Sequence, residues 1–310
     1  MEHIIRTQKP KLADTTISNY LKNINRLYLS YNTDIGNITD LEWIYDKVNL
    51  QKFLDNLKTD NTRKTYYTII ITLLQYDITH NKNIDKQPLM DYWTKKTIKN
   101  FKQNSIKQLI ITTKNEEKII TIDLYNELLD KLKIDNELQP LLMFSILKLY
   151  PFRNEVSSFI LSNGKKMDSD KNYLVINKNQ MKFIRNVYKT FGKYGSKTDI
   201  ITDKKLKKMI INYITELDIK NNEYLFTFKN EPITNIKTTA LLQQYSNKYI
   251  KHKLSTTIIF KTIINDWILD KPRTETELLQ YLEQKGSIRG TDNQNLINYY
   301  VNKKSLTLID

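Results

Sequence analysis

Three kinds of side chain in this sequence, taken in chain order, could act together on a phosphate ester. Arg153 comes directly after a strongly apolar segment that Pro151 ends. Lys189 follows in a segment expected to be a strand, and Tyr299 and Tyr300 stand near the C-terminus. Arginine and lysine bind phosphate oxygens, and a tyrosine hydroxyl can act as a nucleophile. The set predicts a protein that holds a phosphodiester, and the residues between decide whether it also cuts one.

The overall charge favours a polyanionic partner. Of 310 residues, 49 are Lys or Arg and 34 are Asp or Glu, which gives a formal net charge of +15. This surplus favours nucleic acid ahead of an anionic membrane. The alternative source is an AT-rich coding sequence, which raises lysine together with asparagine, isoleucine and tyrosine. Hydrophobic residues make up 40% of the chain, enough for a folded core.

Composition also excludes several chemistries. The chain has no cysteine, so neither disulfides nor a thiolate zinc site is expected. His3, His80 and His252 are too scattered for a metal cluster, and no phosphate loop is present, so we expect no metal and no other cofactor. No apolar run reaches the roughly 18 residues that span a bilayer. The polar opening segment is not a cleavable signal, and a soluble intracellular protein is expected.

The first part of the chain, residues 1–101, is predicted to be a helical domain. Apolar residues recur every three or four positions from Ile17 to Tyr31, which indicates one buried helical face. A further helix begins near Asp60, with Arg63 and Lys64 in its first turn. Positive charge there opposes the helix dipole, so either a phosphate contact or a solvated helix start is expected.

Residues 102–118 are rich in Lys, Asn, Gln and Thr and are interpreted as a basic linker between two domains. The second domain, 119–310, is predicted to be mixed. Its expected strands and helices fall in these ranges: strands at 173–176, 183–188 and 199–201; helices at 124–132, 138–150, 206–217, 238–249, 255–269, 275–284 and 293–301. The fold class is therefore mainly α with a small antiparallel sheet, an α+β arrangement.

Several stretches, taken in order, resemble the tyrosine recombinase (phage-integrase) superfamily. The resemblance is greatest to the divergent integrases of virophages, Polinton-like elements and large DNA viruses. The opening helix and the helix from Thr62 resemble the core-binding domain of that family. The family's catalytic-domain boxes have four counterparts here, which are Leu149–Glu155, Val187–Thr190 with Gly195, Leu254–Lys261, and Arg289–Tyr300.

The resemblance implies roles for particular residues. Arg153 would be the first phosphate-clamping arginine and Lys189 the general acid that protonates the leaving oxygen. Tyr300 would be the nucleophile that forms a 3′-phosphotyrosyl link, with Tyr299 as the neighbouring candidate. The same chemistry needs no metal and no nucleotide. An ion pair with Glu155 is the structural alternative for Arg153.

The sequence departs from the family pattern at the positions that complete the active site. Where a histidine or lysine and then an arginine are expected, the chain has Thr257 and Phe260. Lys261 is the nearest substitute, one helical step of about 100° away. Thr291 replaces the histidine expected after Gly290. Losing one such donor typically costs about 10²–10³ in rate.

DNA contacts are expected from cations on both domains, and the double helix is the expected partner. The candidates are Arg63, Lys64, Lys165, Lys166, Lys182, Arg185, Lys193, Lys197, His252 and Lys253. By resemblance, the chain would form a homo-oligomer on DNA through its C-terminal segment, Ser305–Asp310; packing of that segment on its own domain is the alternative.

Three functions follow as hypotheses. The first is a recombinase-fold DNA-binding factor, viral or from a mobile element, that has lost cleavage and acts in structure, packaging or regulation. Its compartment would be the host cytoplasm or nucleus, or a virion. The second is an active divergent recombinase, with Lys261, His252 or Arg273 in the missing roles. The third is a basic helical protein that binds protein partners.

Overall fold

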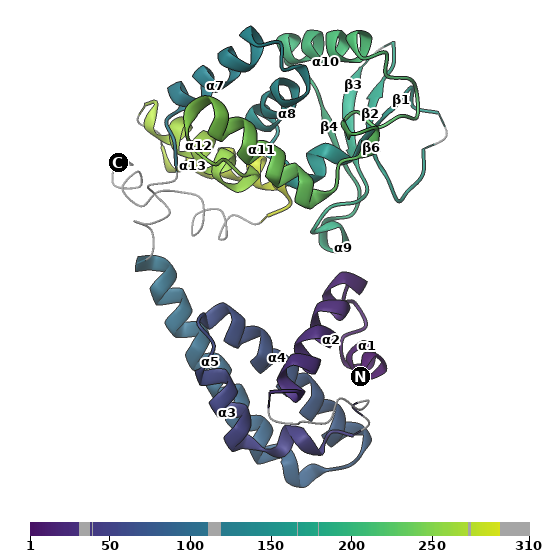
Figure 1. Ribbon diagram of the computed structural model, residues 1–310. Helices are drawn as coiled ribbons and strands as arrows, with labels where there is room; N and C mark the ends of the chain where they lie inside the picture. Colours follow the sequence, from purple (N-terminus) through teal and green to yellow (C-terminus); the bar gives the residue numbers. More distant parts are fainter. Residues whose placement is uncertain are drawn as a thin grey trace. The chain divides into compact units, whose positions relative to one another are not determined.

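The computed structural model describes residues 1–30, 38, 40–110, 119–165, 167–178, 180–271 and 274–291. The chain divides into two compact units, Met1–Ile111 and Thr112–Asp310, which are treated separately here (Figure 1). Helices predominate, and a small sheet lies in the second unit, so the expected α+β class is confirmed. The segments that carry Tyr299, Tyr300 and the expected helix 293–301 lie outside the described residues.

The first unit is helical throughout its described part. Its elements are α1 (Glu2–Gln8), α2 (Asp14–Tyr28), η1 (Glu42–Tyr45), α3 (Lys47–Asp55), α4 (Asp60–His80), η2 (Ile84–Lys86) and α5 (Gln87–Ile110). Helix α4 packs along α5 and also contacts α1 and α2. Its buried residues include Tyr66, Ile70 and Leu73, and Trp93 of α5 is fully buried in the same core. Helix α5 reaches Ile110, so the segment expected to be a linker begins inside a helix.

The second unit combines helices with a four-stranded and a two-stranded sheet. The helices are α7 (Ile122–Ile134), α8 (Leu138–Leu149), η3 (Asn154–Ser158), α9 (Phe191–Tyr194), α10 (Lys204–Glu216), α11 (Asn235–Ile250), α12 (Thr256–Leu269) and α13 (Glu275–Arg289). The strands are β1 (Phe159–Ser162), β2 (Asn172–Ile176), β3 (Met181–Arg185), β4 (Lys197–Ile200), β5 (Thr227–Phe228) and β6 (Glu231–Pro232).

The sheet has the order β1-β2-β3-β4 and is mixed, which corrects the expected antiparallel arrangement. Strands β2, β3 and β4 pair antiparallel, but β1 pairs parallel to β2, with Phe159 opposite Asn172. Strand β1 was not predicted, because its four residues are all buried and show no alternation. Backbone hydrogen bonds from Leu161 to Glu223 and from Leu225 to Phe159 cover its outer edge.

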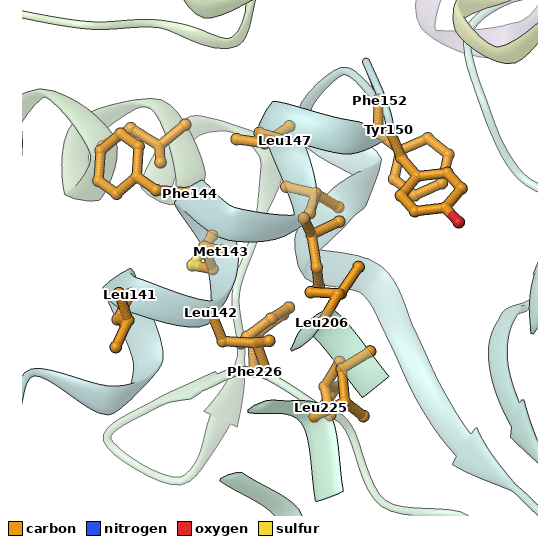
Figure 2. Close-up of a cluster of buried hydrophobic side chains, with 14 of the residues drawn as sticks. Leu141, Leu142, Met143, Phe144, Leu147, Tyr150, Phe152, Leu206, Leu225 and Phe226 are labelled. Atoms are coloured by element: carbon orange, nitrogen blue, oxygen red, sulfur yellow. The ribbon is translucent and has the colours of Figure 1, made fainter. Parts of the chain in front are cut away.

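The core of this unit fixes the backbone on which Arg153 stands. Helix α8 supplies buried side chains to this core, among them Leu142, Phe144 and Leu147 (Figure 2). Pro151 follows its end. Phe152 is fully buried, and its ring centroid lies 5.2 to 5.7 Å from those of Phe183, Phe159 and Tyr150. The aromatic cluster therefore holds the residue before Arg153 in a single position against the sheet.

Candidate phosphate-binding site

Hydrogen bonds from Arg153 and from Arg289 join the Pro151–Arg153 segment to the end of α13. The Nη1 atom of Arg153 donates to the carbonyl oxygen of Arg289 at 2.7 Å. In return, Nη1 of Arg289 donates to the carbonyl oxygens of Pro151 and Phe152 at 3.1 and 3.3 Å. Residues more than a hundred positions apart in the sequence are thereby joined, with the half-buried Arg153 at the edge of the junction.

The turn that carries Lys189 meets the same helix end. Gly290 caps α13 with φ 67° and ψ 50°, and its carbonyl oxygen accepts from Thr190 Oγ1 at 2.9 Å. A Cβ atom at Gly290 would lie 2.3 Å from Thr190 Oγ1 and 3.0 Å from Tyr188 Cε2. Glycine is therefore needed there both for its backbone conformation and for the close approach of the turn. Three of the sequence-predicted segments converge at this point.

Lys189 itself lies in a turn, and the prediction that it stands on a strand is wrong. Strand β3 ends at Arg185, because the residues after it leave the sheet to reach Gly290. The Lys189 side chain is exposed and has no ion pair or hydrogen bond within the described part of the chain. Its ammonium group is consequently open to an external anion.

Helix α9 adds further positive charge beside this turn. The ammonium groups of Lys193 and Lys197 lie 5.0 and 4.8 Å from the ring centroid of Tyr194. Lys197 also donates to the carbonyl oxygen of Ser287, near the end of α13. Partial burial and then the charge of Arg185 lower the pKa of Lys197, against the opposing effect of Asp199. We call Lys189, Lys193, Tyr194 and Lys197 the α9 surface.

Arg185 is not part of that surface, which corrects the expectation that it contacts DNA. Its side chain is fully buried and pairs with Asp199 at 2.9 Å and with Glu155 at 3.5 Å. Its guanidinium also lies 4.5 Å from the ring centroid of Phe152. Burial raises the pKa of the Asp199 carboxyl, although Arg185 acts in the opposite direction. A group enclosed by two carboxylates and an aromatic ring is closed to a DNA backbone.

The buried triad of Arg185, Glu155 and Asp199 also bears on the alternative role of Arg153, an ion pair with Glu155. Glu155 pairs with Arg185, and Arg153 makes its hydrogen bond to the backbone of Arg289. From the sequence, a pair between Arg153 and Glu155 was the structural alternative to a phosphate contact. That pair is not among the contacts of the described residues.

The guanidinium of Arg289 lies beside Thr257 and Phe260, where a basic pair was expected, but it comes from α13 and not from α12. Arg289 donates from Nη2 to Thr257 Oγ1 at 3.3 Å, and its guanidinium lies 4.6 Å from the Phe260 ring centroid. The residue is only 1% exposed. Sequence reasoning missed it as a site residue, and its place directly before Gly290 was the signal available. Lys261, the substitute considered from the sequence, is half-buried on α12.

The remaining predicted cations are dispersed. Arg63 donates to the carbonyl oxygens of Leu54 and Leu57, at 3.0 and 2.6 Å, and pairs with Asp60. It thus closes the end of α3, and the expectation of a phosphate contact there is not supported; Lys64 is half-buried.

In the second unit, Lys165, His252 and Lys253 are exposed, and Lys166 lies outside the described residues. Lys182 is opposite Ile200, whereas Lys197 is opposite Arg185. Lys182 is therefore at the other end of the sheet from the α9 surface.

Neither a metal-binding cluster nor a membrane-spanning helix is found among the described residues. No group of three or more His, Cys, Asp or Glu side chains in that part of the chain has metal-binding geometry. None of its helices combines the length and hydropathy of a membrane span.

Comparisons with known proteins give one distant likeness. No family model matches the chain, and no curated protein matches it. Among solved structures, the chain is similar to one described as "Crystal structure of XerA recombinase", with 10% sequence identity and a TM-score of 0.43. The alignment covers 99% of this chain and 94% of that chain. At this distance, the likeness assigns neither a family nor an activity.

Proposed function

We propose that this chain is a duplex-DNA-binding protein with a tyrosine-recombinase-like second unit in which strand cleavage is lost or strongly reduced. The observation that carries the proposal is the convergence of Arg153, the Lys189 turn and Gly290 at the end of α13. These segments were singled out for phosphate chemistry from sequence alone. Their meeting at one point supports a shared task.

The α9 surface supports a nucleic acid partner in particular. Cationic groups interleaved with an aromatic ring are a combination used to hold a sugar–phosphate backbone, and Tyr194 is such a ring, half-buried between lysines. Lys189 is open to an anion, and Lys193 and Lys197 flank Tyr194 within 5.0 Å. Together with the net charge of +15, this favours DNA over a protein partner.

The loss of cleavage is argued from the second basic box. Transition-state charge on a phosphate needs several donors aimed at its oxygens. Thr257 and Phe260 supply no such cation, and the neighbouring Arg289 is buried with its N–H groups committed to Pro151, Phe152 and Thr257. A phosphate at Arg153 would be bound with too few donors to be cut efficiently.

The role in the cell is part of the same proposal. The motif resemblance favours a viral or mobile-element origin, and a DNA-binding factor without cleavage would serve in structure, packaging or regulation. A homo-oligomer formed on DNA through Ser305–Asp310 is proposed on the same basis.

Covalent trapping separates this proposal from an active recombinase. Nicked suicide duplexes are incubated with the wild-type chain and with Tyr300→Phe, and denaturation-resistant adducts are counted. We expect duplex binding at low salt and no adduct from either protein. An adduct formed by the wild type and abolished by Tyr300→Phe would establish the active enzyme. Failure to bind duplex DNA at low salt would overturn the proposal as a whole.

A further inference from the structure

A shallow hollow of about 470 Å³ lies at Asn154, the residue that follows Arg153. It is lined by Asn154, Asn235, Ile236, Thr239, Ala240 and Gln243. Asn154 ties the hollow to the phosphate site, because its Nδ2 donates to the carbonyl oxygen of Asn235 and to Thr239 Oγ1, both at 2.9 Å. Its Oδ1 accepts from Thr256 Oγ1 at 3.3 Å. The first turns of α11 are thereby fixed next to Arg153.

The side chains that α11 presents to this hollow are neutral hydrogen-bonding groups. Asn235, Thr239 and Gln243 are spaced four residues apart and so share one helical face. The side-chain amides of Asn235 and Gln243 have no hydrogen-bond partner within the described part of the chain. Both amides therefore keep a donor and an acceptor for an external ligand.

Apolar groups lie alongside these amides on the same face. Ile236 is 84% exposed, and Ala240 is also exposed. An isoleucine so open to water at the edge of a polar hollow gains burial only when a partner covers it. This face of α11 thus presents both amide and apolar side chains to solvent.

Charge is placed at the rim of this face and is absent from its centre. Helix α11 contains no Asp or Glu over Asn235–Ile250. Lys237 lies 5.3 Å from the ring centroid of Phe228, and Lys229 of the β5–β6 turn lies 5.9 Å from the same ring. Cations at the edge of the face can contact DNA phosphates, which position a protein on the duplex. A centre without acidic groups can contact base edges, which specify the sequence.

We propose that this face of α11 reads A·T base pairs in the major groove next to the phosphate held at Arg153. The inference rests on the proposed DNA-binding function. An α-helix fits the major groove, and Asn or Gln amides pair in bidentate fashion with adenine N6 and N7. The methyl groups of Ile236, Ala240 and Thr239 suit the thymine methyl. Neither Arg nor Lys lines the hollow, so the contact that favours guanine is missing.

The test is selection of bound duplexes from a random pool by the full-length chain. We expect enriched A·T pairs at fixed positions. In Asn235→Ala/Gln243→Ala the enrichment at those positions is lost, a change of roughly 5- to 150-fold in relative affinity for each bidentate contact. Gln244→Ala/Asn247→Ala removes two amides from the same helix outside the hollow, and should leave the selected sequence unchanged.

Three results would overturn the inference. The first is an unchanged preference in the Asn235→Ala/Gln243→Ala variant, and the second is enrichment of G·C pairs by the wild type. The third is tight wild-type binding with no sequence preference, which would leave the proposed function intact. Absence of duplex binding at low salt is distinguishable from these, because it would overturn the proposed function as well. Thermal unfolding of both variants confirms that each is folded.

Discussion

Gly290 is the residue on which the convergence of the three segments depends. Its φ of 67° is the left-handed conformation, and a Cβ atom would lie 2.3 Å from Thr190 Oγ1. We expect Gly290→Ala to destabilise the fold by at least about 1–2 kcal/mol from the backbone alone, with further loss from the clash. Chemical denaturation measures the change. Gly192→Ala is the matched control, since nothing lies within 4 Å of a Cβ there. Equal stability losses in the two variants would contradict the close packing at Gly290.

The buried triad gives a second prediction at the residue scale. Arg185→Met leaves Glu155 and Asp199 as buried carboxylates without their cation, which should cost roughly 3–5 kcal/mol of unfolding free energy. Lys171→Met removes an exposed pair with Asp168 and should cost about 0–1 kcal/mol. If Arg185→Met instead kept full stability and lost DNA affinity, Arg185 would be a DNA contact after all.

Single residues also mark what could be predicted from sequence. Arg153, Lys189 and Gly290 could be picked out because their residue types and order are informative without knowledge of the fold. The burial of Arg185 could not, because its partners Glu155 and Asp199 come from η3 and β4, and only the sheet brings them together. Arg289 was missed for the same reason, since its acceptors at Pro151 and Phe152 are remote in sequence.

At the scale of elements, helices were the more predictable part. The capped and periodic helices α10 and α12 were expected close to their observed bounds, and Pro151 correctly marked the end of α8. Helix α13 begins at Glu275 as expected but continues past the expected end at 284 to Arg289. Strand β1 was missed, because a fully buried strand has no alternating pattern. The strand expected at 183–188 ends early, because Tyr188–Thr190 is drawn to Gly290, a tertiary contact that local propensity does not encode.

The junction between α8 and the sheet makes a prediction at this scale. Phe152 packs against Tyr150, Phe159 and Phe183, so Phe152→Ala should cost about 3–5 kcal/mol of unfolding free energy. Phe191→Ala is the control, because that ring is 41% exposed on α9. Denaturant unfolding of the two variants measures the difference. A cost for Phe152→Ala no larger than that for Phe191→Ala would mean that the aromatic cluster does not fix the Arg153 backbone.

At the scale of the whole molecule, the chain combines a helical unit with an α+β unit that carries the converged site. The first unit ends at Ile111, and α5 continues to Ile110. Both positions lie inside the segment 102–118 that was interpreted as a linker. A helix could not be foreseen there, because the segment lacks an apolar face of regular period. The assignment of the first unit as a DNA-binding domain stays a prediction, since Arg63 is committed to the backbone of its own unit.

The most direct test of the account is the salt dependence of duplex binding by two matched double variants. Lys189→Gln/Lys193→Gln neutralises two cations of the α9 surface. Lys204→Gln/Lys208→Gln removes equal charge from exposed positions on α10, which follows the far end of β4. If DNA phosphates lie at the α9 surface, the first variant reduces the slope of log affinity against log salt by roughly 2, and the second leaves it unchanged. Equal slopes for both variants and the wild type would contradict the central claim.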